Sequence, residues 1–65
     1  MIAILGAGAM GEVFVAGLLR SGIEPGRLVI SEKREERAQE VSRLHGVRAV
    51  SLAEAARESA TIALL

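Results

Sequence analysis

The spacing of apolar positions changes along the chain, and each change marks a new element. Residues 2–5 form a continuous apolar run that ends in glycine, which is typical of a parallel strand covered by helices on both faces. The spacing then becomes helical, with an apolar stripe at Met10, Val13, Phe14, Gly17 and Leu18. We therefore predict a strand over residues 2–5 and a helix over roughly residues 9–21, which packs through this stripe and ends at Gly22.

The same alternation continues through the middle of the chain. A turn at residues 24–26 leads to a second buried strand over residues 28–30, which ends near Ser31. A charged segment follows, and its thin apolar stripe predicts a second helix that Gly46 closes. The members of that stripe are Ala38, Val41 and Leu44.

The last third of the chain predicts a short edge strand, a third helix and a fourth strand. Residues 48–50 are the edge strand, and residues 51–54 match a capping box that starts a helix ending at about residue 59. Residues 61–65 are the fourth strand. Alternating strands and helices with right-handed crossovers predict an α/β fold, with a Rossmann-type parallel sheet in the order 3-2-1-4.

A glycine motif joins the first predicted strand to the first predicted helix. Gly6, Gly8 and Gly11 match the pattern G-x-G-x-x-G. Gly6 permits a sharp turn, Gly8 leaves room for a pyrophosphate and Gly11 lets the helix approach the sheet, while backbone N–H groups and the helix dipole meet the phosphate charge. A flexible turn, a flavin site and an S-adenosylmethionine site are the alternatives. The position of the motif between strand and helix favours a dinucleotide site.

Two residues of the first predicted helix have structural interpretations. Gly17 costs about 1 kcal/mol relative to alanine inside a helix, so we expect it to pack closely against a strand. For Met10 we favour a core position over contact with the ring end of a cofactor, because long apolar side chains at helical spacing usually pack.

The tip of the second strand is where such folds discriminate NAD from NADP. It carries Ser31, Glu32, Lys33 and Arg34. A carboxylate here accepts hydrogen bonds from the ribose hydroxyls and repels a 2′-phosphate, whereas serine, lysine and arginine bind that phosphate. A solvated helix start is the alternative, and we accept it for the acidic residues that follow. For the tip itself we favour NADPH, held with Glu32 turned outward, and NADH is the alternative cofactor.

Composition narrows the remaining possibilities. The 65 residues contain no cysteine and one histidine, His45, so we expect neither disulfides nor a metal site. Eight basic and eight acidic residues leave no net charge, which argues against nucleic acid and anionic membranes as partners. No apolar run is long enough for a signal peptide or a membrane span, so we expect a cytoplasmic location.

Several stretches of the chain carry a family resemblance. They are residues 2–12 (IAILGAGAMGE), residues 17–22 (GLLRSG), residues 31–38 (SEKREERA) and residues 45–47 (HGV). Together they resemble the amino-terminal segment of pyrroline-5-carboxylate reductase over essentially the whole chain. The resemblance implies an oxidoreductase that reduces 1-pyrroline-5-carboxylate to L-proline, the last step of proline biosynthesis, by hydride transfer from NADPH or NADH.

The resemblance also implies which residues bind the cofactor. The cofactor loop would consist of Gly6, Ala7, Gly8, Ala9, Met10 and Gly11. The contacts to the ribose and its 2′-phosphate would come from Ser31, Glu32, Lys33 and Arg34. Ala9 departs from the polar residue frequent in the family and lacks the side chain for one loop hydrogen bond. Glu32 departs from the phosphate-binding residues of many members and argues against the NADPH preference.

We expect residues 1–65 to be the N-terminal part of a dinucleotide-binding domain, because the chain stops in a predicted buried strand. In the resembled family a C-terminal helical domain, not included here, dimerises and holds the small-molecule substrate. The resemblance therefore implies a homo-oligomer at full length and an inactive fragment, and it names no catalytic residue in this chain. The alternatives are another NAD(P)-dependent oxidoreductase, of the β-hydroxyacid dehydrogenase or F420-dependent NADP reductase type, and a non-catalytic nucleotide-binding module.

Overall fold

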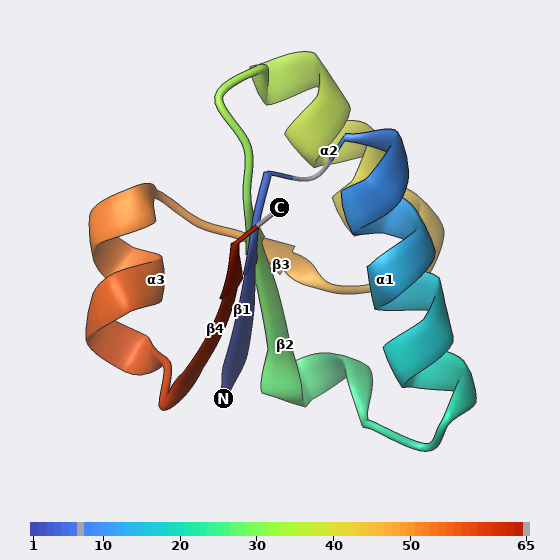
Figure 1. Cartoon of the computed structure of the whole chain (residues 1–65). Coiled ribbons are helices and arrows are strands. Elements are labelled where there is room, and N and C mark those ends of the chain that lie inside the picture. Colours follow the sequence, from blue (N-terminus) through green and yellow to red (C-terminus); the bar gives the residue numbers. More distant parts are fainter. Residues whose placement is uncertain (7, 65) are drawn as a thin grey trace.

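Four parallel strands form the sheet at the centre of the computed structural model, which describes residues 1–6 and 8–64 (Figure 1). Within the described residues, the strands are β1 (Ile2–Leu5), β2 (Leu28–Ser31), β3 (Arg48–Ala49) and β4 (Thr61–Leu64). Their order across the sheet is β3-β2-β1-β4, and each neighbouring pair is parallel. The predicted Rossmann-type α/β fold and the predicted order 3-2-1-4 are confirmed.

Helices cover both faces of the sheet, as Figure 1 shows. Two helices, α1 (Ala9–Arg20) and α2 (Glu35–His45), lie on one face, and α3 (Leu52–Glu58) lies on the other. A short 3-10 turn, η1 (Pro25–Arg27), leads into β2. Each crossover returns the chain to the same end of the sheet, so the carboxyl ends of all four strands meet at one edge.

The apolar side chains of the strands alternate between two core clusters, because successive residues of a strand point to opposite faces. The cluster under α1 and α2 consists of Ile4, Val15, Leu28, Ile30, Val41 and Val47. The cluster under α3 consists of Ala3, Val29 and Ala55. Burial on both faces explains why the central strands β1 and β2 have continuous apolar runs rather than alternating ones.

Local signals start and end the helices where the sequence predicts. Gly46 closes α2 in the left-handed conformation, with a φ of 69°. At the start of α3, the Glu54 N–H donates a hydrogen bond to the Ser51 hydroxyl at 3.1 Å. This contact is the serine half of the predicted capping box.

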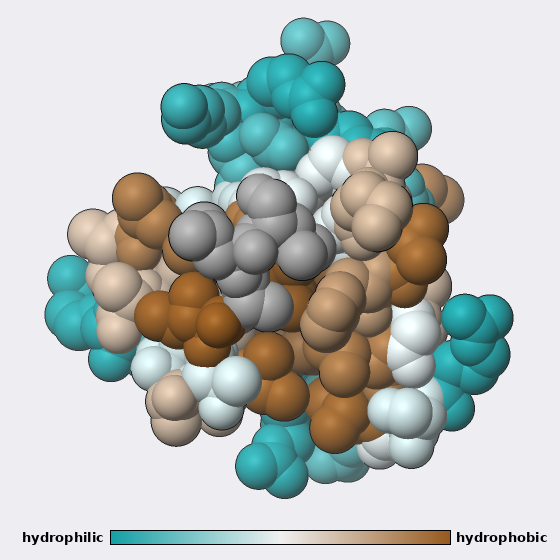
Figure 2. Space-filling model, viewed as in Figure 1, coloured by the Kyte–Doolittle hydropathy of each residue, from teal (hydrophilic) through white to brown (hydrophobic). Residues whose placement is uncertain are grey.

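The face that α1 turns to the sheet differs from the predicted one except at Leu18, which packs against the core as expected. Gly11 and Val15 are its buried residues, whereas Met10, Val13 and Phe14 are 73%, 64% and 44% exposed. Figure 2 shows apolar side chains gathered over α1 on the surface. The predicted core position of Met10 is wrong, because α1 is apolar around most of its circumference and spacing alone does not determine its rotation. The absence of a side chain at Gly11 lets that side approach the sheet.

Two further expectations are also wrong. A Cβ on Gly17 would meet no atom within 4 Å, so this glycine is not packed against a strand. Leu44 is 62% exposed, although Ala38 and Val41 of the same predicted stripe are buried. The position two helical turns after Ala38 is His45, and this residue contacts α1 in place of Leu44.

Candidate nucleotide site

The glycine turn lies at the carboxyl end of β1 and leads directly into α1. Gly6 has a φ of 89°, which residues with a Cβ rarely adopt, and its N–H donates a hydrogen bond to the Ser31 carbonyl at 2.8 Å. Gly8 is the N-cap residue of α1, and its carbonyl accepts a hydrogen bond from the Glu12 N–H at 2.9 Å. Ala7, which also belongs to the predicted loop, lies outside the described residues.

The start of α1 presents backbone donors beside this turn. The first N–H groups of an α-helix have no acceptor within the helix. Among the described residues, no side chain accepts a hydrogen bond from these groups at the start of α1, where Gly8 is the N-cap residue. Ala9, Met10 and Gly11 supply these groups at the positive end of the helix dipole. Such a helix end binds phosphate, so this part of the predicted loop has the donors that a pyrophosphate requires.

Gly8 also lies close to the residues that follow β2. A Cβ built on Gly8 would lie 3.7 Å from Nη2 of Arg34. The glycine therefore keeps open a space between the loop and an arginine, and a larger side chain would fill that space.

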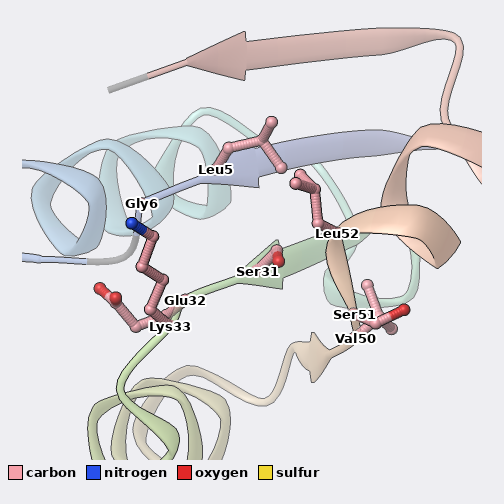
Figure 3. A pocket seen from close by; sticks show the side chains of 8 residues that line it. All are labelled: Leu5, Gly6, Ser31, Glu32, Lys33, Val50, Ser51 and Leu52. Carbon is pink, nitrogen blue, oxygen red and sulfur yellow. The ribbon is translucent and has the colours of Figure 1, made fainter.

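A cavity of about 440 Å³ opens beside the glycine turn (Figure 3). This volume is in the range of small-molecule sites. The cavity is lined by Leu5, Gly6, Ser31, Glu32, Lys33, Val50, Ser51 and Leu52. These residues come from the ends of β1 and β2 and from the segment between β3 and α3, which is where open α/β sheets bind ligands.

Sequence reasoning misses Val50, Ser51 and Leu52, which form one wall of this cavity. The Val50 N–H donates a hydrogen bond to the Ile30 carbonyl at 2.8 Å, so the chain continues alongside β2 past the end of β3. In Figure 3 the side chains of Leu5 and Leu52 point toward each other. The predicted strand order already places the end of β3 beside the tip of β2, and this adjacency is the signal that would have found the wall.

Glu32 is turned into the site. Its side chain is only 9% exposed and lines the cavity. The Arg34 backbone N–H donates to one of its carboxylate oxygens at 3.3 Å, and Nη2 of Arg34 lies 3.5 Å from the other. The bond from the backbone N–H lowers the pKa of Glu32 below its ordinary value, so the carboxylate is charged at neutral pH. The expected outward orientation of Glu32 is therefore wrong, because local hydrogen bonds hold it inward.

The two cations at the tip of β2 are exposed. In Figure 3 the Lys33 side chain extends from the loop after β2 toward Gly6. The Arg34 side chain is 69% exposed and lies beside the Gly8 backbone. Of the predicted site residues, the structure brings four into the cavity lining, namely Gly6, Ser31, Glu32 and Lys33. The other described ones do not line the cavity and lie at the starts of α1 and α2, and these are Gly8, Ala9, Met10, Gly11 and Arg34.

The arrangement fits a nucleotide cofactor. A glycine turn and a helix N-terminus offer donors to phosphates, a charged carboxylate offers acceptors to hydroxyls, and the two leucines offer apolar surface to a ring. Within residues 1–6 and 8–64, no group of three or more histidine, cysteine, aspartate or glutamate residues is placed to hold a metal ion. In the same part of the chain, no helix has the length and apolar content that crossing a membrane requires.

Comparisons with known proteins identify relatives of this chain. The family described as NADP oxidoreductase, coenzyme F420-dependent, matches residues 1–65. The protein named pyrroline-5-carboxylate reductase of Mycobacterium tuberculosis (strain ATCC 25618 / H37Rv) is 38% identical over 98% of this chain. Proteins of the same name from Mycobacterium leprae (strain TN) and Corynebacterium melassecola are 37% and 35% identical over 83% and 71% of the chain. The predicted resemblance is confirmed.

The chain spans about a fifth of the length of these curated relatives. The matched regions cover 21%, 18% and 17% of the three proteins, respectively. No solved structure matches the chain significantly.

Proposed function

The chain belongs to the family of NADP oxidoreductases described as coenzyme F420-dependent, and on that premise we propose that it is the cofactor-binding part of a pyrroline-5-carboxylate reductase. The reaction would reduce 1-pyrroline-5-carboxylate to L-proline in proline biosynthesis, in the cytoplasm. The glycine turn beside the cavity is the observation that carries this proposal. The relatives named pyrroline-5-carboxylate reductase support the choice of substrate.

In this proposal the two parts of the site hold two parts of the cofactor. The pyrophosphate lies against residues 6–11, where the start of α1 supplies N–H donors without the need for a cationic side chain. The adenosine occupies the cavity, where Leu5 and Leu52 cover the adenine ring and Glu32 accepts hydrogen bonds from the ribose. The bound cofactor supplies the hydride, and the residues of this chain hold and orient it.

We propose NADPH as the preferred cofactor, with NADH as the alternative. Ser31, Lys33 and Arg34 provide a hydroxyl and two cations at the tip of β2, and the description of the family names NADP. Glu32 opposes this preference, because its inward carboxylate repels a 2′-phosphate and already binds Arg34. NADPH binding therefore requires Arg34 to exchange a carboxylate partner for a phosphate, which keeps the preference modest.

The substrate and the catalytic groups would come from the rest of a longer protein. The curated relatives are about five times as long as this chain. We propose that a C-terminal helical domain dimerises and holds the small-molecule substrate, and that residues 1–65 alone bind nucleotide without turnover.

The test is an assay of the full-length protein with 1-pyrroline-5-carboxylate and NADPH. We expect NADPH oxidation that depends on the pyrroline substrate and yields proline. NADPH binding without proline formation would overturn the substrate assignment. A failure to bind NADPH or NADH at all would overturn the cofactor site itself.

A second candidate is favoured by the description of the family, which names coenzyme F420. In that case the full-length protein would exchange a hydride between NADP and F420, with the same nucleotide site. Replacing the pyrroline substrate by oxidised F420 in the same assay separates the two candidates. F420 reduction in the absence of proline formation would establish the second one.

A further inference from the structure

One carboxylate joins the two helices that carry the nucleotide site. Glu12 lies in the first turn of α1, immediately after the glycine turn, and its side chain is 26% exposed. One of its oxygens, Oε1, accepts a hydrogen bond from Nη2 of Arg37 on α2. The other, Oε2, lies 2.9 Å from Nε2 of His45, at the far end of α2.

The partners of Glu12 are themselves held in place. Nη1 of Arg37 donates to the Glu40 carboxylate at 2.7 Å within α2, and the side chains of Arg37 and His45 are 23% and 21% exposed. The hydrogen bonds from His45 and Arg37 lower the pKa of Glu12 below its ordinary value, so the carboxylate is charged at neutral pH. Because the carboxylate is charged and partly covered, its contacts from α1 to α2 are strong, directional hydrogen bonds.

The position of α2 determines where the tip of β2 lies. The Ala38 N–H donates to the Arg34 carbonyl at 3.0 Å, so Arg34 belongs to the hydrogen-bonded start of the helix. Apolar burial at Ala38 and Val41 holds α2 on the sheet, but such contacts are non-directional and permit sliding and rotation. Arg37 and His45 are roughly 12 Å apart along the helix axis. Since both reach Glu12, α2 cannot slide without breaking one of these contacts.

We propose that Glu12 is a positioning residue that fixes Lys33 and Arg34 opposite the glycine turn, and that it thereby sets the affinity for the adenosine 2′-phosphate of the cofactor. This inference rests on the proposed nucleotide site. Glu12 acts through Arg37 and His45, and its contacts connect the loop that holds the pyrophosphate to the loop that meets the 2′-phosphate. Loss of Glu12 therefore weakens binding of NADP more than binding of NAD, because only NADP carries the 2′-phosphate.

The test is a titration of the full-length protein with NADP and with NAD, for the wild type and for Glu12→Ala. We expect the ratio of the affinity for NADP to the affinity for NAD to fall by about threefold or more in Glu12→Ala. Glu12→Gln, which keeps the shape of the side chain, gives a smaller fall in the same direction. Glu24→Ala is the matched control, because it removes an exposed carboxylate that lies on neither α1 nor α2, and it should leave the ratio unchanged.

A variant cycle separates positioning from general stability. In a background that carries both Lys33→Ala and Arg34→Ala, Glu12→Ala should have little further effect on the ratio, because both groups that Glu12 positions are gone. An unchanged ratio in Glu12→Ala would overturn the inference, whether both affinities are unaltered or both are weakened equally. If the wild type binds neither nucleotide, the proposed function fails as well, and this outcome is distinct from binding with an unchanged ratio.

Discussion

The backbone N–H of Gly6 donates a hydrogen bond to the carbonyl of Ser31 at 2.8 Å, directly past the paired ends of β1 and β2. This bond joins the glycine turn to the tip of the second strand. The loop that meets the pyrophosphate in the proposed complex and the loop that meets the ribose therefore start side by side at one edge of the sheet. The wall formed by residues 50–52 completes the cavity beside them.

Gly8→Val should abolish binding of NADPH and NADH to the full-length protein. Gly8 has a φ of −78°, which valine also adopts, so the substitution should not strain the backbone. Its added side chain would fill the space between the loop and Arg34, where a Cβ already lies 3.7 Å from Nη2. Isothermal titration calorimetry checks the result. Gly26→Val is the matched control, since its Cβ meets nothing within 4 Å; unchanged affinity in Gly8→Val would place the pyrophosphate elsewhere.

Changes at the tip of β2 should alter the choice of cofactor. Lys33→Ala and Arg34→Ala should each lower the affinity for NADPH about fivefold and leave NADH binding nearly unchanged, because only NADPH carries the 2′-phosphate. Glu32→Gln should raise the affinity for NADPH relative to that for NADH, because it removes a charge that repels the 2′-phosphate and releases Arg34. Paired titrations with the two nucleotides measure these ratios. If the lysine and arginine variants keep the wild-type ratio, these cations do not bind the phosphate.

Gly17→Ala should stabilise the protein by about 1 kcal/mol. Gly17 lies inside α1, its Cβ would meet no atom within 4 Å, and alanine loses less backbone entropy than glycine in a helix. Urea denaturation of the wild type and the variant measures the difference in free energy of unfolding. A destabilised variant would mean that α1 packs through Gly17, as its spacing in the sequence first indicates.

The sequence predicts the course of the chain better than it predicts the side-chain network. Gly6, Gly22 and Gly46 all have positive φ, and each ends an element at the place where its residue type predicts an end. The strand order follows from right-handed crossovers. The rotation of α1 does not follow, because most of its circumference is apolar. The contacts of Glu12 join residues 25 and 33 positions apart, and a single sequence holds no pattern for them.

Acid should destabilise the protein partly through Glu12. Its pKa is lowered from 4.5 by the hydrogen bonds from His45 and Arg37, so the unfolded chain binds this proton more tightly than the folded chain. The stabilisation is fully present above pH 4.5 and is lost as the pH falls through the lower folded value. Urea denaturation at a series of pH values should show this loss in the wild type, and Glu12→Gln should reduce it. The exposed Glu24→Gln is the charge-matched control, and identical pH profiles for all three proteins would contradict the assignment.

The most direct test of the nucleotide site is to map where the cofactor contacts the chain. Amide chemical shifts of the full-length, isotope-labelled protein are recorded by NMR as NADPH is added. We predict that the largest changes occur at residues 8–11, 31–34 and 50–52, which the fold brings to one edge of the sheet. Saturable changes confined to other residues, with these signals unmoved, would show that the nucleotide site is not at this edge.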